Sequence, residues 1–128
     1  MIKNRKMGHI GLAVNDIEAS TQWYVDVLGF ELIGSFETPD GIPARFLKGK
    51  DFIYELFSPH GGAPAPGKID HFCFDSTDIE ADYAHCLALG CTFDTDGIEC
   101  IPTFWDNGVK LFKILSATGE IIEFCQIL

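Results

Sequence analysis

Two histidines and two glutamates stand at matching positions of a repeat within this 128-residue chain. His9 opens "HIGLAVNDIEA" and His71 opens "HFCFDSTDIEA", so six residues separate each histidine from the same Asp-Ile-Glu-Ala phrase. Near the end of each repeat, Glu55 in "FIYELF" and Glu123 in "EIIEFC" are flanked by apolar residues. Glutamate is rarely buried unless it is paired or bound to a metal. We therefore predict a His-Glu-His-Glu set that the pseudo-twofold of the repeat could bring together.

This ligand set has a definite chemistry. Neutral imidazole combined with carboxylate suits divalent zinc, nickel, cobalt, iron or manganese better than calcium or Cu(I). A six-coordinate ion would keep two positions for substrate oxygens, an arrangement that suits Lewis-acid stabilisation of an enediolate. A glutamate that leaves the ion could take a proton from a carbon next to a carbonyl, which needs both a base and charge stabilisation.

Each of these residues also has an ordinary structural explanation. A single histidine in a strand is more often a core or surface residue than a ligand, and a single glutamate in an edge strand is usually solvated. The coincidence of four residues at repeat-equivalent positions favours ligation. His60 and His85 have no partner in the other repeat. We place them in the linker and in the second helix and interpret them as ordinary core or surface histidines.

The residue patterns predict which elements must position the set. In "MGHIGLAV", Ile10, Leu12 and Val14 alternate with His9 and two small residues, which predicts a strand with the histidine on the face away from the helix. Asn15 or Asp16 can cap the following helix, and Gly29 suits its end. Three further strands are predicted at "FELIGSF", "ARFLKG" and "DFIYELFSP".

The second repeat has the same order. A strand at "KIDHFCFDS" places His71 opposite Phe72 and Phe74, Thr77 or Asp78 caps a helix that runs to Gly90, and strands follow at "CTFDTDG", "GVKLFKIL" and "EIIEFCQIL". These elements predict an α+β fold of two tandem βαβββ modules that form a curved mixed sheet around a metal site. We expect one domain over 1–128, with module 1 at about 5–60, a Gly/Pro linker at 61–67 and module 2 at about 68–128.

Composition excludes several partners. The formal net charge is -10 and the nine lysines and arginines form no dense run, which argues against nucleic acid and anionic membranes. We expect no membrane span and no secretory signal, because no long apolar stretch occurs. The five cysteines are odd in number and form no CxxC, so we expect free thiols in a reducing cytoplasm rather than disulfides or a cysteine-based zinc site.

The double βαβββ plan, "HIGLAVNDIEASTQWYVDVLGFEL" and the closing "GEIIEF" resemble the vicinal-oxygen-chelate (glyoxalase/bleomycin resistance/dioxygenase) superfamily across nearly the whole chain. Within it, His9, Glu55, His71 and Glu123 match the metal set of glyoxalase I. The resemblance implies a carbon-sulfur lyase like lactoylglutathione lyase, which isomerises a hemithioacetal through a metal-bound enediolate. It also implies one nickel, cobalt or zinc ion per site, with manganese or iron as further options, a small-molecule substrate and a homodimer. Glu123 is the first choice as proton-transferring base and Glu55 the second.

Other members of the superfamily offer alternatives. A methylmalonyl-CoA epimerase has the same plan but commonly has glutamine at the second ligand, where this chain has Glu55. A small-molecule-sequestering resistance protein generally lacks the ligand set. An extradiol dioxygenase would have histidine at the second ligand.

The sequence offers three candidates for substrate binding: Phe104 and Trp105 in "CIPTFWDNG", and Arg45. The aromatic pair could equally belong to the core or to a dimer interface, and Arg45 could be a solvent-facing strand residue. An arginine that many glyoxalase I sequences place shortly after the first histidine is absent from "GLAVND". The identity of the thiol therefore stays open.

Overall fold

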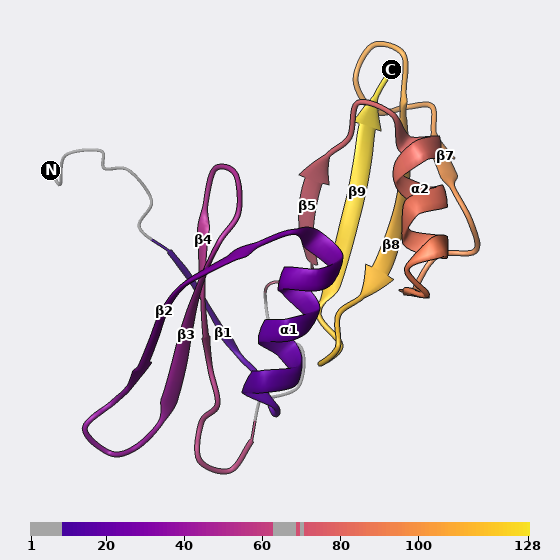
Figure 1. Cartoon of the computed structure of the whole chain (residues 1–128). Helices are drawn as coiled ribbons and strands as arrows, with labels where there is room; N and C mark the ends of the chain where they lie inside the picture. The colour runs from indigo at the N-terminus through magenta and orange to yellow at the C-terminus, as the bar shows by residue number, and fades with distance from the viewer. Residues whose placement is uncertain (1–8, 63–68, 70) are drawn as a thin grey trace, which may run out of the picture. The chain divides into compact units, whose positions relative to one another are not determined.

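The computed structural model describes residues 9–62, 69 and 71–128, and these contain two helices and nine strands (Figure 1). The chain divides into two compact units, Met1–Ala65 and Pro66–Leu128, which we describe one at a time. Most of the predicted linker at 61–67, and the start of each predicted module, lie outside the described residues.

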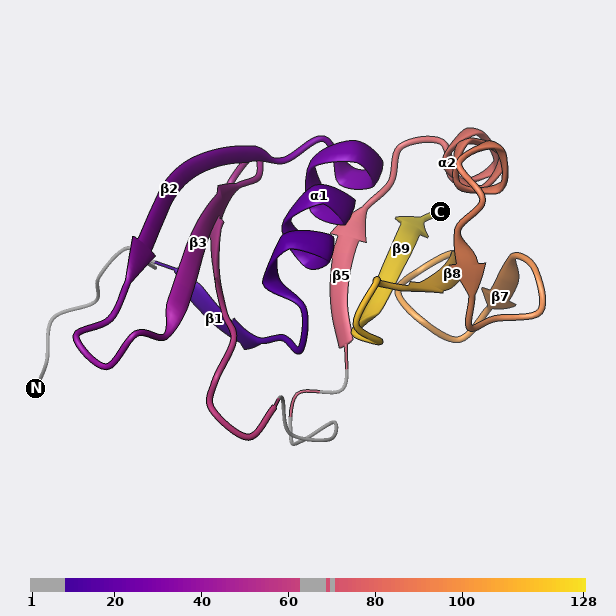
Figure 2. The same ribbon diagram turned by 60° about the horizontal axis from the view of Figure 1, so that its bottom comes forward.

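The first unit has the predicted βαβββ order. Its sheet runs β1-β4-β3-β2, with β1 parallel to β4 and the other pairs antiparallel. The helix α1 lies against one face of this sheet, as Figure 2 shows. The elements are β1 (Ile10–Ala13), α1 (Ile17–Leu28), β2 (Glu31–Glu37), β3 (Pro43–Lys48) and β4 (Ile53–Phe57).

The residues that flank helix α1, Asp16 and Gly29, determine where it begins and ends. Of the two predicted caps, Asp16 is the one that acts: its side chain accepts a hydrogen bond from the Ala19 amide at 3.0 Å. At the other end, Gly29 has φ +68°, the left-handed conformation that ends a helix and that glycine adopts without steric cost. Both signals were readable in the sequence.

The helix-facing side of the first sheet forms the core of this unit. Tyr24 of α1 packs edge-to-face against Tyr54 of β4 at 5.4 Å between ring centroids, and both residues are buried. Leu47 and Leu56 are fully buried beside them, and such burial contributes about 1.5–3 kcal/mol per side chain. Because successive residues of a strand face opposite ways, the residues between these lie on the face away from α1.

The second unit repeats the order with one addition. Its sheet runs β5-β9-β8-β6, with β5 parallel to β9, and the short β7 pairs with β8 beside this path. We did not predict β7. A bend that includes Gly97 (φ +86°) separates β7 from β6, and both short strands pair with β8. The elements are β5 (His71–Asp75), α2 (Ile79–Ala88), β6 (Thr92–Phe93), β7 (Glu99–Ile101), β8 (Val109–Leu115) and β9 (Ile121–Ile127).

Helix α2 is capped by Asp78, which accepts from the Ala81 amide at 3.1 Å. Its C-terminus ends in a Schellman motif, in which the Cys91 amide donates to the Cys86 carbonyl at 3.0 Å and the Gly90 amide donates to the Leu87 carbonyl. The core below it is aromatic and aliphatic. It contains Phe112, which stacks on Phe124 at 5.0 Å, with Ile114 and Ile122 fully buried.

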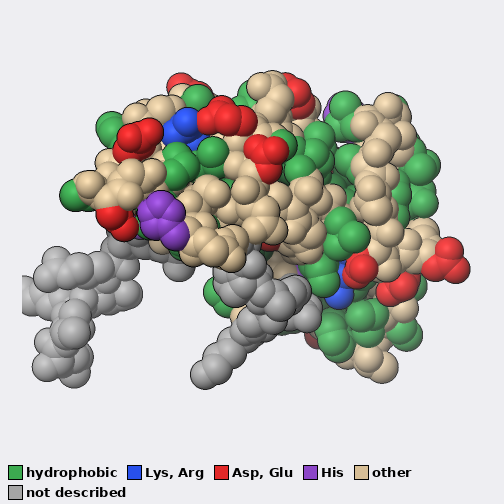
Figure 3. All heavy atoms as spheres, turned by 90° about the horizontal axis from the view of Figure 1, so that it is seen from below, with side chains coloured by type: hydrophobic (Ala, Val, Ile, Leu, Met, Phe, Trp, Pro, Cys, Tyr) green, Lys and Arg blue, Asp and Glu red, His purple; other side chains and the backbone are tan. Residues whose placement is uncertain are grey.

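The predicted α+β fold of tandem βαβββ modules is thus confirmed, with one open mixed sheet in each unit. Among the described residues, no helix is long and apolar enough to cross a membrane. On the face shown in Figure 3, acidic side chains outnumber basic ones, and the whole chain carries a formal net charge of -10.

Candidate metal centre

The strand register places one histidine and one glutamate side by side in each unit. In the first unit β1 runs parallel to β4, and Gly11 pairs with Glu55, so His9, two residues earlier, shares the face of Glu55. In the second unit β5 runs parallel to β9, and Cys73 pairs with Glu123, so His71 shares the face of Glu123. The two pairs are therefore equivalent in register as well as in sequence.

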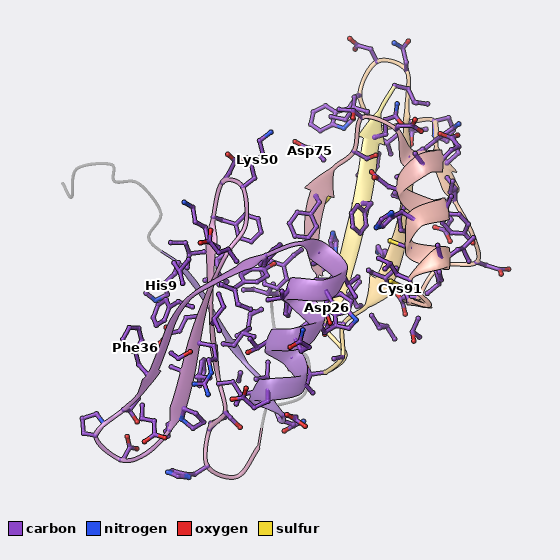
Figure 4. The ribbon with its side chains drawn as sticks, viewed as in Figure 1. His9, Asp26, Phe36, Lys50, Asp75 and Cys91 are labelled. Atoms are coloured by element: carbon purple, nitrogen blue, oxygen red, sulfur yellow. The ribbon has the colours of Figure 1, made fainter. Side chains whose placement is uncertain are left out.

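The first pair is in direct contact. His9 Nε2 lies 3.1 Å from Glu55 Oε2, with side chains 48% and 30% exposed. Both belong to the sheet face opposite α1, where Figure 4 shows His9 on the same side as Phe36. The His9 ring also contacts Phe46 edge-on at 5.6 Å between centroids. This aromatic contact packs the His9 ring on the same sheet face as the carboxylate.

The second pair is more enclosed. His71 Nε2 lies 3.6 Å from Glu123 Oε2, and the two side chains are 34% and 11% exposed. Glu123 is a buried residue of β9, as its apolar neighbours in the sequence predict. A carboxylate buried to this degree requires positively charged or hydrogen-bonding partners.

These separations suit the ligands of a common ion. Imidazole nitrogen and carboxylate oxygen each bind zinc at about 2.1 Å. Two such atoms lie about 3.0 Å apart at a right angle and about 3.4 Å apart at a tetrahedral angle. The observed 3.1 Å and 3.6 Å fall at or close to these values. Each pair therefore has the chemistry and spacing of half of a four-ligand site.

The two pairs differ in their neighbours. Opposite Glu55, β3 presents the apolar ring of Phe46, whereas opposite Glu123, β8 presents Lys113. Lys113 Nζ lies 3.7 Å from Glu123 Oε2 and its side chain is 25% exposed. We did not predict a role for Lys113, although it stands between the large apolar residues Phe112 and Ile114 of a predicted strand.

Cys73 is the second difference, because it occupies the position that Gly11 has in the first unit. The residue is exposed, but partial burial of its thiol raises the thiol pKa to about 12. Glu123 also raises this pKa, through a hydrogen bond with the thiol and through its negative charge. Cys125, two residues after Glu123, also has a raised pKa, chiefly through burial. Both thiols are therefore protonated at neutral pH when no cation is bound.

Arg45 lies apart from the first pair. It pairs with Leu56 across β3 and β4, on the face that α1 covers, while Glu55 points to the opposite face. Its guanidinium donates to Glu18 of α1 at 2.5 Å and to the Ala44 carbonyl at 3.0 Å. Arg45 thus joins the helix to the sheet, and the structure does not bring it to Glu55.

Phe104 and Trp105 lie in the loop between β7 and β8 and are 54% and 69% exposed. This loop precedes Val109, which is four residues along β8 from Lys113, or roughly 14 Å at strand spacing. Within the second unit, the two aromatic residues therefore lie well away from Glu123. Trp105 has φ +54°, a backbone conformation that L residues rarely adopt.

Comparison with known proteins agrees with this architecture. Residues 6–109 match the model of the Glyoxalase/Bleomycin resistance protein/Dioxygenase superfamily. The uncharacterized protein YwbC of Bacillus subtilis is 32% identical over 127 residues, covering 95% of this chain and 98% of YwbC.

Two further similarities are informative. An ethylmalonyl-CoA/methylmalonyl-CoA epimerase of Cereibacter sphaeroides is 30% identical over 86 residues, which cover 59% of this chain and 64% of the epimerase. The crystal structure of a glyoxalase family protein from Enterococcus faecalis superposes with a TM-score of 0.80 at 19% identity, covering 94% of this chain and 97% of that one. With the repeated βαβββ plan and the extent of the family match, the chain belongs to the Glyoxalase/Bleomycin resistance protein/Dioxygenase superfamily.

Proposed function

We propose that this chain is a metal-dependent enzyme of the glyoxalase I type, in which His9, Glu55, His71 and Glu123 hold one divalent ion. The observation that carries the proposal is the pair of His–Glu contacts at equivalent register in the two units. The residues around the two pairs differ, with Gly11 against Cys73 and Phe46 against Lys113, whereas the His–Glu pair itself is common to both units.

Each pair supplies two ligands, and a zinc-type site takes at least three from the protein. A complete site therefore needs both pairs, contributed either by one chain or by two chains of a homodimer. Imidazole and carboxylate donors suit nickel, cobalt or zinc, and also manganese or iron. We place this enzyme in the cytoplasm, where five free cysteines are compatible with the reducing environment.

The proposed reaction is proton transfer next to a carbonyl in a hemithioacetal, the chemistry of a lactoylglutathione lyase. The ion, when bound, supplies Lewis-acid stabilisation of the enediolate oxygens. Glu123 takes the proton from one carbon onto a carboxylate oxygen and returns it to the neighbouring carbon. Its side chain is 11% exposed against 30% for Glu55, so a proton held on Glu123 is the better protected from exchange with water.

A substrate panel tests this function. The metal-reconstituted protein is assayed with methylglyoxal and several thiols, and Glu123→Gln is assayed beside it with His85→Ala as a matched control outside the pairs. We expect turnover with at least one thiol, a loss of about 100-fold or more in kcat for Glu123→Gln, and full activity in His85→Ala. Equal activity of Glu123→Gln and the unmodified protein would remove Glu123 as the base.

Acyl-CoA epimerisation is the second candidate, and the similarity to the Cereibacter sphaeroides epimerase favours it. It uses the same proton transfer next to a carbonyl, so Glu123 and Glu55 would be the bases in that reaction too. Adding an epimerisable acyl-CoA to the panel and following solvent deuterium incorporation distinguishes the two. Tight binding of a small molecule with no turnover of any substrate would favour a sequestering protein of this superfamily.

A further inference from the structure

A second group of metal-binding atoms lies in the second unit and includes two sulfurs. Cys73 of β5 and Cys125 of β9 lie on the same sheet face as Glu123, and the three ligand atoms are all within 4.8 Å of one another. The two cysteines are 52 residues apart in the sequence, so no spacing motif marks them. The parallel register of β5 and β9 brings them together.

The first unit has no equivalent of these thiols. In the strand register of the first unit, Gly11 takes the position of Cys73. Phe57 takes the position of Cys125, because each stands two residues after the glutamate of its unit. The repeated His–Glu pair is thus common to both units, whereas the sulfurs belong to the second. Their presence beside Glu123 requires an explanation other than the repeat.

The donor set has a clear metal preference. Thiolate sulfur selects zinc, cadmium and other thiophilic ions over magnesium or calcium, and three protein ligands leave one position open. Ligands bound at about 2.3 Å for sulfur and 2.1 Å for oxygen lie about 3.6–3.8 Å apart in a tetrahedron. Side-chain rotation that moves the donors by no more than about 1 Å therefore brings them to these distances. Cys73 is exposed, which gives an ion access from solvent.

We propose that Cys73, Glu123 and Cys125 form a binding site for a thiophilic divalent cation of the zinc and cadmium class. Binding releases the two thiol protons to the buffer, and the cation replaces Lys113 as the charge that compensates Glu123. His71 Nε2 lies 3.6 Å from Glu123 Oε2, so His71 is a candidate for a fourth ligand. If the proposed function holds, Glu123 serves both sites, so that a cation held by the sulfurs withdraws one ligand from the His-Glu-His-Glu set.

Cadmium titration of the full-length, metal-free, reduced protein tests the site by its sulfur-to-metal charge-transfer absorption, which does not depend on enzymatic activity. We expect the band to saturate at about one cadmium per chain. Cys73→Ser and Cys125→Ser should each weaken cadmium binding about ten-fold or more, since even residues that only orient a ligand have effects of that size. Thermal unfolding of each variant checks that it is folded.

Two control variants make the result specific. Cys100→Ser removes an exposed thiol on β7 that does not belong to the Cys73, Glu123 and Cys125 group. His9→Ala removes a residue that belongs to the His-Glu-His-Glu set and not to this group. We expect both to keep the charge-transfer band and the cadmium affinity. An absent band, or a band that survives in the folded Cys73→Ser/Cys125→Ser double variant, overturns the proposal. Loss of the band in a folded His9→Ala variant also overturns it, because the sulfurs would then bind cadmium only together with a ligand of the His-Glu-His-Glu set.

Discussion

Lys113 Nζ lies 3.7 Å from Glu123 Oε2, and the position that corresponds to Lys113 in the first unit belongs to Phe46. One glutamate therefore faces a cation across the strand pair and the other faces an aromatic ring. In the absence of a metal, this ammonium compensates the more buried of the two carboxylates. The duplicated module has thus kept its His–Glu pair while changing the charge around it.

Replacing Lys113 with methionine is expected to strengthen divalent metal binding, because the ammonium competes with the metal for the same carboxylate oxygen. We expect a gain of about five-fold in affinity, equivalent to roughly 1 kcal/mol. Calorimetric titration with cobalt measures it. Lys110→Met is the matched control, since this lysine lies on the same strand but pairs with Glu80 of α2 at 2.5 Å. Equal affinities of the two variants would show that Lys113 does not compete for Glu123.

Metal content should depend on both histidines of the repeat. We expect about one divalent ion per purified chain, and less than about a tenth of that in His9→Ala or His71→Ala, because each variant loses one of four ligands. Elemental analysis of the purified proteins gives the ratio. His85→Ala should retain the full amount. Undiminished metal in the His9 and His71 variants would contradict the ligand assignment.

The Asp-Ile-Glu-Ala phrase that makes the repeat visible is expected to contribute stability rather than chemistry. Asp16 and Asp78 each accept a hydrogen bond from an amide in the first turn of a helix. Replacing either with alanine should lower the free energy of unfolding by about 1 kcal/mol. Urea denaturation measures the loss, and Asp78→Asn should restore most of it because asparagine also caps helices. Metal content that falls in a folded Asp78→Ala protein would show that the phrase also affects the site.

Stability is expected to fall in alkaline solution because of the buried thiols. Burial raises the pKa of Cys86 to about 12 from its ordinary value near 9, and nearby Cys91 acts in the same direction. The folded chain therefore holds a proton that the unfolded chain loses. This contribution is complete below about pH 9 and disappears as the pH rises towards about 12. The urea midpoint of the unmodified protein should be lower at about pH 10 than at about pH 8. The difference between the two midpoints should be smaller in Cys86→Ala.

The sequence predicted those features that depend on neighbouring residues. Alternation in "HIGLAV" and "HFCF" correctly separated the histidines from the core, and the capping residues marked both helix starts. It could not predict features that depend on strand register. Lys110 and Lys113 are three residues apart and point to opposite faces, but the sequence does not say which one faces Glu123. The same uncertainty hid the position of Arg45 on the helix side of its sheet.

The parallel pairing of first and last strands has a consequence for how the protein folds. His9 and Glu55 are separated by 46 residues, and His71 and Glu123 by 52, so each contact closes a long loop of its unit. Contacts of such large sequence separation carry a high entropic cost of loop closure and form slowly. A metal ion that binds the completed His–Glu pairs stabilises the native state and not a transition state in which these strands are still apart. It would therefore slow unfolding while leaving the rate of folding nearly unchanged.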